Sequence, residues 1–493
     1  MQVDRFNDII GFCREAATAR GLYHIVRIQE RNDLAVLINN GKTEEINTAR
    51  LSGIGLQVFT PDGNMGFAAA DQISQAVVAD LFEKAAFLAE TGRFFNCETN
   101  REIFKAKSLV KRVELPVRYP QESLTLTEIE AKLKELNQQL TALDPRLSVR
   151  TLMRLTREEW RISRTDGTDV AFNTPRSYIY HAFTAKSGSE TATTYANLPG
   201  IDLGILIEPE RLEHLQKRAE KAARLALDLL GAPKFPGGHY KLVIDYALAK
   251  GLAHEAFGHA AETDNIESSI LGENGKFRRG LRVADRRLSI IDGPLEGDYA
   301  YQPLSAVGLE RQTVRIVDHG VLNTGLADIF SAAQAGVAPT GAERVENFFH
   351  LPIARMSNIR IEFDDPIPLK QDFYTVTPVD LYHLLLRHRL AQPDEPVLYL
   401  TGFQGGQVNP AFGDFVFNCS AVYRLSERPQ LYKPVIFSGK VLSVLESVTA
   451  ALGELQIDAM GTCGKMGQGV PSCGGSHYFL VIERNPEIMI GGE

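Results

Sequence analysis

Apolar residues recur at helical spacing in several segments of this chain. Near the N-terminus they fall at Phe6, Ile9, Ile10, Cys13 and Ala17, which predicts an amphipathic helix. Other segments with helical patterns or helix boundary signals predict longer helices at 71–92, with Asp71 as N-cap, at 125–143, ended by Asp144-Pro145, and at 208–230. Two shorter helices are expected at 327–335 and 379–389.

Alternating apolar and polar positions, interrupted by turn residues, predict strands between these helices. Turns are expected at Asn40-Gly41, at Pro61–Asn64 and at Arg164–Gly167, which would separate strands over 34–70 and 147–184. The second half carries further turn signals, such as Asp292-Gly293-Pro294 and Asn409-Pro410. The fold class expected is therefore α+β: a mixed α/β N-terminal domain, then a β-rich, antiparallel and barrel-like C-terminal domain.

The length of the chain, 493 residues, is enough for two large domains with cores of their own. The segment GAPKFPGG, residues 231–238, is rich in glycine and proline and is the predicted linker. The expected domains are thus 1–230, an α+β domain, and 239–493, a β-rich domain that carries the candidate chemistry.

Composition and charge exclude several classes of protein. The chain is 44% hydrophobic and 23% charged, as in ordinary globular proteins, and its net charge of −8 argues against nucleic acid as a partner. It shows neither a signal-peptide pattern nor an apolar run long enough to span a bilayer, so no membrane partner is expected. The five cysteines, an odd and sparse set, indicate a reduced, cytoplasmic protein.

The segment LAHEAFGHAAETD, residues 252–264, carries the candidate chemistry: His254 and His259 lie five positions apart, and Glu255 follows the first. On a regular α-helix the two imidazoles would point roughly 140° apart and could not bind one ion. A single π-turn, with i→i+5 hydrogen bonds, would bring them to one face, and Gly258 has no side chain to oppose it. The alternative is a pair of ordinary polar residues on a half-buried helix, which the apolar neighbours make costly.

A catalytic zinc ion needs a third protein ligand and an open position for water. The residues themselves leave several candidates: the other histidines, the carboxylates Glu262 and Asp264, and two cysteines, Cys463 and Cys473, in the glycine-rich stretch MGTCGKMGQGVPSCGGSHYF. Spacing does not choose between the cysteines, and each could instead be a small buried apolar residue.

Several stretches together resemble the TldD/PmbA family, whose members were formerly called modulators of DNA gyrase. HEAFGHAAETD is similar to the family's HExxxH segment, and ERNDLAVLINNGKTEEINTARLSGIGLQVFTPDGNMGFAAA to its N-terminal strands. Later matches are the segment ending in RMSN, GGQVNPAFGDFVFNCSAVYRL and GTCGKMGQGVP. The stretch AETDNIESSILGENGKFRRG departs from the family pattern, which leaves substrate preference and partner open.

The resemblance implies a zinc metallopeptidase that hydrolyses unfolded or flexible peptides. His254, His259 and Cys463 would bind Zn²⁺, and Glu255 would act as general base on a zinc-bound water; all four match the family's catalytic subunit rather than its metal-free paralogue. A homodimer or a heterodimer with such a paralogue is expected. The alternatives are a non-catalytic peptide-binding or assembly subunit with a structural or absent metal, and a zinc hydrolase acting on another bond.

Four further residues are candidates for substrate binding. Gly464 and Lys465 follow the cysteine ligand, and the loop they belong to could hold an oxyanion or the peptide backbone. Gln407 and Asn409 lie in the GGQVNP stretch and could contact a peptide added at a sheet edge. Arg355, in the RMSN stretch, is expected to form a structural ion pair rather than to bind substrate.

Overall fold

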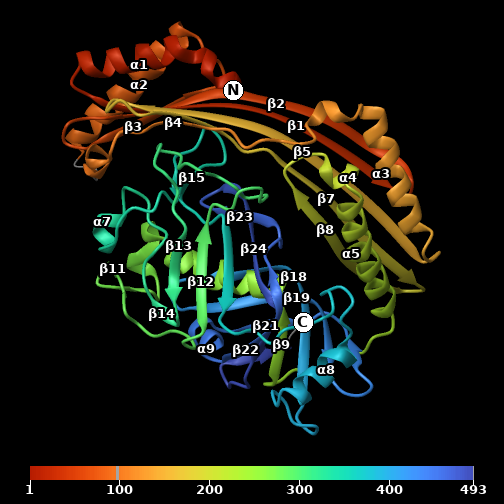
Figure 1. The fold of residues 1–493 in the computed structure, drawn as a ribbon. Coiled ribbons are helices and arrows are strands. Elements are labelled where there is room, and N and C mark those ends of the chain that lie inside the picture. Colours follow the sequence, from red (N-terminus) through yellow and green to blue (C-terminus); the bar gives the residue numbers. More distant parts are fainter. Residues whose placement is uncertain (96–98, 492–493) are drawn as a thin grey trace.

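Two large sheets organise the protein. The computed structural model describes residues 1–95 and 99–491, which leaves Cys97 outside the described residues. About 26% of the chain is helix and 40% is strand, which confirms the mixed class of the fold. Figure 1 shows long N-terminal strands arching over the C-terminal part, with helices near both ends of the arch.

The N-terminal sheet has the strand order β3-β2-β1-β5-β6-β4, and β7 and β8 extend it from β5. Its strands are β1 (Tyr23–Asn39), β2 (Lys42–Phe59), β3 (Met65–Ala70), β4 (Val110–Val113), β5 (Leu147–Arg164), β6 (Asp169–Asn173), β7 (Arg176–Ser187) and β8 (Glu190–Gly200). The predicted turn between β1 and β2 is confirmed: Asn40 and Gly41 both have positive φ, at 47° and 76°, as a two-residue type I′ hairpin requires.

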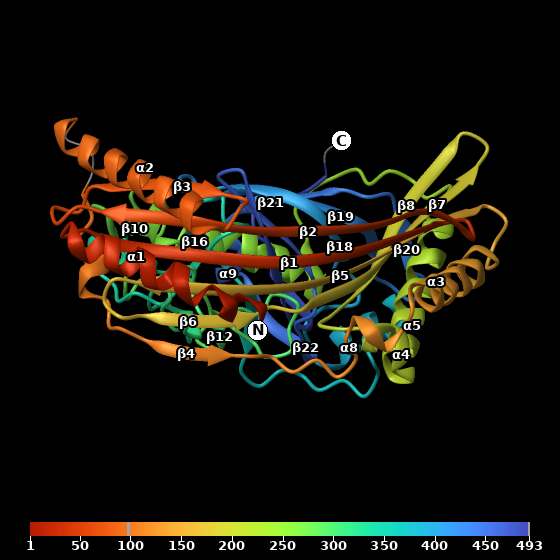
Figure 2. The ribbon, with the colours of Figure 1, turned by 90° about the horizontal axis from the view of Figure 1, so that it is seen from above.

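Helices lie near the two ends of the long strands, as Figure 2 shows from above. They are α1 (Asn7–Ala19), α2 (Gln75–Phe94), α3 (Leu126–Thr141), α4 (Gly204–Ile207) and α5 (Pro209–Asp228). The start predicted for α2 at Asp71 is wrong, because Ser74 is the N-cap and its hydroxyl accepts from the Val77 N–H. Thr125 caps α3 through a capping box with Glu128.

The C-terminal sheet has the order β14-β13-β12-β17-β24-β9-β18-β19-β21-β25, with β20 paired to β19 and both β22 and β23 paired to β24. Its strands are β9 (Lys241–Asp245), β12 (Leu288–Gly293), β13 (Val314–Asp318), β14 (Val321–Leu322), β17 (Asn358–Phe363), β18 (Val397–Asn409), β19 (Asp414–Arg424), β20 (Gln430–Tyr432), β21 (Ile436–Lys440), β22 (Val448–Gln456), β23 (Gly461–Lys465), β24 (Gln468–Ile482) and β25 (Ile488–Ile490). Two short hairpins flank it: β10 (Gly272–Glu273) with β11 (Lys276–Phe277), and β15 (Glu343–Arg344) with β16 (Ile353–Ala354).

This sheet corrects two expectations for the C-terminal half. It is mixed rather than antiparallel, because β17 pairs with β24 and β9 with β18 in parallel. It is also not barrel-like: within residues 1–95 and 99–491 no sheet closes on itself. Parallel strands need long crossover connections. Local turn signals in the sequence do not predict such long-range pairing.

In the part of the chain that the structure describes, three α-helices accompany the C-terminal sheet besides the segment that carries the histidines. They are α7 (Ala332–Ala335), α8 (Pro378–Arg387) and α9 (Val441–Glu446). The helix expected at 327–335 is mostly wrong, because the Asp328 carboxylate instead accepts from the N–H groups of Phe330 and Ser331 and holds a turn there. Among the described residues, no helix combines the length and the apolar character needed to span a membrane.

The segment with the two histidines starts from a buried central strand. β9 is buried throughout, and the Asp245 carboxylate at its end accepts from the Leu248 N–H, 2.8 Å away, to begin α6 (Tyr246–Gly251). The residues that follow are almost all buried in the largest apolar core, with Leu252, Ala253, Ala256 and Phe257 fully covered. A rigid strand and a packed helix therefore fix the position of the candidate site.

Candidate metal centre

A π-helix, Leu252–Gly258, continues directly from α6 and carries His254. The His259 N–H donates to the His254 carbonyl, five residues back, and His259 begins a short 3₁₀ turn. Gly258 is needed for packing rather than for an unusual backbone angle, because its φ is −59°. A Cβ at this position would lie 2.0 Å from the Met356 sulfur. A side chain at position 258 would therefore require Met356 to move.

Cys463 comes from the other side of the site, on the hairpin of β23 and β24. The buried Arg355 guanidinium donates to the main-chain carbonyls of Cys463 and Gln468, one on each strand of that hairpin. The expected ion pair of Arg355 is therefore wrong: this side chain clamps the hairpin through its backbone and so fixes the cysteine.

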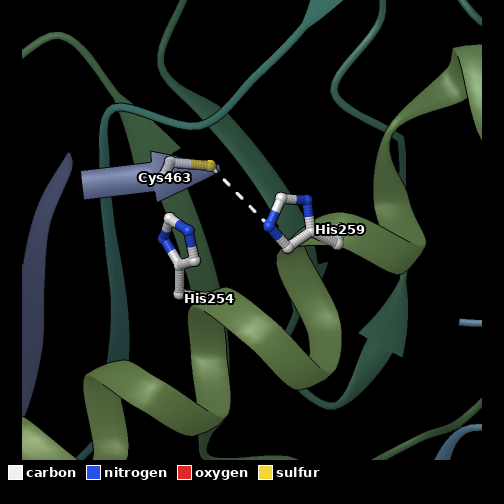
Figure 3. A group of neighbouring side chains, drawn as sticks. All are labelled: His254, His259 and Cys463. Atoms are coloured by element: carbon white, nitrogen blue, oxygen red, sulfur yellow. Dashed lines mark hydrogen bonds between the residues drawn. The ribbon is translucent and has the colours of Figure 1, made fainter. Parts of the chain in front are cut away.

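His254, His259 and Cys463 point toward a common centre, as Figure 3 shows. One ligand atom from each lies within 4.8 Å of the others, and Cys463 Sγ is 3.7 Å from His259 Nε2. The two imidazole rings are perpendicular, with centroids 5.2 Å apart. His254 and Cys463 are buried, while the His259 side chain is 12% exposed. The predicted ligand set is therefore brought together in space.

The chemistry of these donors fits a zinc ion. Zn–N and Zn–S bonds of about 2.1 and 2.3 Å in a tetrahedron place ligand atoms about 3.5 Å apart. The distance from Cys463 Sγ to His259 Nε2, 3.7 Å, is close to this value. Imidazole nitrogen and thiolate sulfur are donors that Zn²⁺ prefers. Two imidazoles and one sulfur lie together here, with two of the three side chains buried. This donor set supports the assignment of the cluster to a metal.

Glu262 and Lys465 support His259 from behind. Glu262, which is 1% exposed, places Oε2 3.0 Å from His259 Nδ1 and 2.9 Å from Lys465 Nζ. Burial lowers the pKa of His259, but the Glu262 carboxylate and the Cys463 sulfur outweigh it and hold that pKa well above its usual value. A carboxylate on the second nitrogen is the usual way to orient a metal-binding imidazole. Glu262 therefore leaves Nε2 of His259 directed at the centre.

His254 has the opposite electrostatic environment. Burial, and next the Lys250 ammonium, hold the pKa of His254 well below its usual value, so this imidazole is neutral and able to bind a metal. Lys250 is itself buried, and its Nζ donates to the Ser472 hydroxyl at 3.0 Å. Lys250 was not predicted as a site residue; the one signal in the sequence is a lysine a single helical turn before His254 within an apolar segment.

Glu255 lies at the accessible edge of the cluster. Its Oε2 is 3.8 Å from His259 Nε2, and its side chain is 23% exposed. The carboxylate is thus beside the proposed metal and within reach of solvent, as a group that exchanges protons with water must be.

The remaining candidates are placed less close to the centre. Cys473 is buried elsewhere on β24, where its thiol donates to the Ile457 carbonyl. Gly464 and Lys465 lie on the hairpin next to Cys463, with Gly464 exposed and Lys465 paired to acids. Gln407 and Asn409 are exposed on β18, and Asn409 accepts from the Ala411 N–H within its own turn. No contact described here joins these last two to the metal ligands.

Solved structures share this fold over its whole length. The structure of TldE from Thermococcus kodakarensis aligns with a TM-score of 0.72 and 14% identity, covering 99% of this chain and all of that one. A structure from Bacteroides thetaiotaomicron, described as a modulator of DNA gyrase, aligns with a TM-score of 0.72 and 16% identity over both full chains. The fold therefore defines a class of two-sheet proteins that includes TldE.

Sequence comparison then gives the family. The models of PmbA/TldA metallopeptidase domain 1, of the central domain and of the C-terminal domain match residues 26–89, 119–230 and 237–474. The chain belongs to the PmbA/TldD metallopeptidase family, which confirms the resemblance drawn from its motifs.

Curated relatives carry names that agree with this family. A metalloprotease of Methanothermobacter thermautotrophicus is 26% identical over 100% of both chains. A metalloprotease TldD homolog of Haemophilus influenzae is 31% identical over 56% of this chain and 52% of its own. A zinc metalloprotease TldD homolog of Saccharolobus solfataricus is 25% identical over 52% of each. These names support peptidase activity, with a metal, in the family.

Proposed function

We propose that this protein is a zinc-dependent peptidase that hydrolyses unfolded or flexible peptides. The observation that carries the proposal is the convergence of His254, His259 and Cys463, with the Glu255 carboxylate at the accessible side of the cluster. The name of the Saccharolobus relative supports zinc as the metal. The cluster is buried on the side of His254 and Cys463 and accessible on the side of Glu255. A catalytic site requires such an accessible side for water and substrate.

Zinc, when bound, would supply Lewis acidity that polarises the scissile carbonyl and lowers the pKa of water. The residues of the chain supply the rest. Glu255 accepts a proton from the attacking water and returns it to the leaving amine. Glu262 and Lys465 keep His259 in the tautomer and orientation that direct Nε2 to the ion. Arg355 keeps the Cys463 hairpin in place.

The alternative is a non-catalytic peptide-binding or assembly subunit. A structural zinc site usually has four protein ligands. The cluster found among the described residues contains three, and a free carboxylate lies next to it. These features favour an enzyme over a structural site.

Metal analysis and a cleavage assay test the proposal together. We expect about one zinc per chain, and we expect Glu255→Gln to keep that zinc while losing cleavage of an unstructured peptide. The assay is run on the chain alone and with a metal-free paralogue, because we propose that the protein works as a homodimer or as such a heterodimer. If the chain binds zinc fully but cleaves no peptide, either alone or with the paralogue, the protein is a non-catalytic binding subunit.

A further inference from the structure

A cavity of about 710 Å³ lies between the N-terminal sheet and the C-terminal part. Phe59 of β2 and Met65 of β3 line one wall. Asp264, Asp328 and Phe330 line the other, on segments that follow the histidines in the chain. The function proposed above assigns nothing to this cavity.

Two side chains connect the cavity wall to a metal ligand. Asp264 faces the cavity and accepts from Lys465 Nζ at 2.6 Å. The same Nζ lies 2.9 Å from Glu262, which holds His259. An extended peptide advances about 3.3 Å per residue. Three short contacts thus separate the cavity wall from His259, a distance that an extended peptide covers in a few residues.

The inner wall holds more carboxylates than cations. Asp328 is 3% exposed and accepts from neutral donors, the N–H groups of Phe330 and Ser331 and the Ser331 hydroxyl. Glu343, behind it, is fully buried, and its Oε2 has no hydrogen-bond partner among the described residues. Burial, and next the charge of Asp328, raise the pKa of Glu343 to about 7. Lys465 is the cation in contact with this wall, and it is shared between Glu262 and Asp264.

Arg101 lines the rim of the cavity, where its side chain is 62% exposed and pairs with Asp62, a carboxylate that it shares with Arg93. On the inner wall one cation, Lys465, is shared by two carboxylates, and Asp328 adds an acid that accepts only from neutral donors. The inner wall therefore favours a positively charged occupant.

The apolar walls suit a long side chain with a charged end. Phe59 and Phe330 stack with ring centroids 6.1 Å apart and planes inclined by 17°, and Leu351 adds an aliphatic surface. Lysine and arginine bury their methylene stems along such surfaces, and an aromatic face attracts the cationic head.

We propose that this cavity is a specificity pocket for a lysine or arginine side chain of the peptide substrate. Asp328 and Asp264 bind the charged end, and the two phenylalanine rings with Leu351 bind the stem. The proposal rests on the peptidase function given above, and it adds the class of substrate.

Matched peptides test the pocket in the zinc-loaded chain. A lysine, an arginine, a norleucine or a glutamate is placed in turn at each position of an unstructured peptide of glycine, alanine and serine. At one position we expect lysine and arginine to raise kcat/KM about tenfold over norleucine, the effect of one charge-assisted hydrogen bond. Equal kcat/KM for lysine and norleucine at every position would overturn the pocket and leave the peptidase standing.

Binding separates a failed pocket from a failed peptidase. The Glu255→Gln chain, loaded with zinc, is titrated with the same peptides by calorimetry. We expect the lysine peptide to bind about tenfold more tightly than its norleucine twin, even where the wild type cleaves neither. Equal affinities, or binding of neither peptide, would overturn the pocket regardless of cleavage.

Substitutions in the cavity wall test whether its acids cause the preference for lysine. Asp328→Asn and Asp264→Asn should each bring the lysine-to-norleucine ratio toward one. Asp318→Asn is the matched control, because Asp318 is a half-exposed acid at the end of β13 and does not line the cavity. Circular dichroism checks that each variant folds. An unchanged ratio in both folded wall variants would overturn the assignment.

Discussion

Cys463 and Cys473 lie on the two strands of one hairpin but in different chemical surroundings. Cys463 faces two imidazoles, whereas Cys473 is enclosed against the Ile457 carbonyl. Burial raises the pKa of the Cys473 thiol well above its usual value, which keeps it protonated. A thiol that stays protonated is not a zinc ligand.

The first prediction follows from this contrast. Cys463→Ser should lower the zinc content to near zero, because one of three protein ligands is lost and a serine hydroxyl is a poor replacement for a thiolate. Cys473→Ser should keep about one zinc per chain. Elemental analysis after dialysis against a weak chelator measures both. Loss of zinc from the Cys473 variant alone would reverse the assignment.

The second prediction concerns Glu343. Its pKa is raised to about 7 in the folded chain, from 4.5 in an exposed carboxyl, so the folded state holds a proton that the unfolded state has released. Stability conferred by that proton is complete below the unfolded pKa and is lost as the pH rises toward 7. Relative to Glu343→Gln, the wild type should lose about 3 kcal/mol over this window. Denaturant unfolding at several pH values measures the difference, and a difference that is flat with pH would contradict it.

At the scale of single residues, the candidate metal ligands and Glu255 were easier to predict from the sequence than the residues that surround them. His254, His259 and Glu255 stand out because their types and spacing are chemically unusual in an apolar segment. The roles of Lys250 and Arg355 were missed or mistaken, because each depends on a partner more than a hundred positions away: Ser472 for the first, and the Cys463 and Gln468 carbonyls for the second. Spacing along a chain carries no information about such partners.

Among the elements, the π-helix Leu252–Gly258 determines the site most directly. Its i→i+5 hydrogen bond accounts for the five-residue spacing of the histidines, and Gly258 lets Met356 pack against it. The turn is therefore held by its own hydrogen bonds and also by packing against β17 and against Met356, just before that strand.

The third prediction tests that packing. Gly258→Ala should lower the free energy of unfolding by about 1–3 kcal/mol through overpacking, and should also lower zinc affinity because the turn must shift. Gly11→Ala is the control: this glycine lies within α1, nothing lies within 4 Å of the added Cβ, and alanine should stabilise the helix by about 0.5–1 kcal/mol. Denaturant unfolding and a zinc titration give the two readouts. An alanine at 258 that binds zinc as tightly as the wild type would show that the turn is adaptable.

Element boundaries were predictable where local chemistry decides them. The Asn40-Gly41 hairpin and the Thr125 cap of α3 depend on neighbouring residues, and both are present. The parallel pairings of β9 with β18 and of β17 with β24 depend on segments far apart in the chain, and so the expected antiparallel barrel is absent from the described residues. The boundary proposed at 231–238 stays a prediction.

At the scale of the whole molecule, the candidate metal centre joins two distant parts of the chain. The histidines follow β9 and α6 in the chain, while Cys463 lies on the β23–β24 hairpin near the C-terminus. An ion bound by both parts would act as a cross-link that only the folded state offers.

The fourth prediction is that zinc stabilises the fold. At a free zinc concentration about 100 times Kd, the free energy of unfolding should rise by about 2.7 kcal/mol over the metal-free chain, by mass action. Cys463→Ser should show no such gain. Thermal unfolding with graded zinc and with chelator measures the Tm of both chains, and equal Tm values for metal-free and zinc-loaded wild type would contradict it.

The five-residue spacing of the histidines also has a consequence for the detection of similar sites. A search pattern based on regular helical geometry passes over this segment, although its two imidazoles lie together with Cys463. A pattern that allows one inserted residue, with glycine directly before the second histidine, would include segments of this kind.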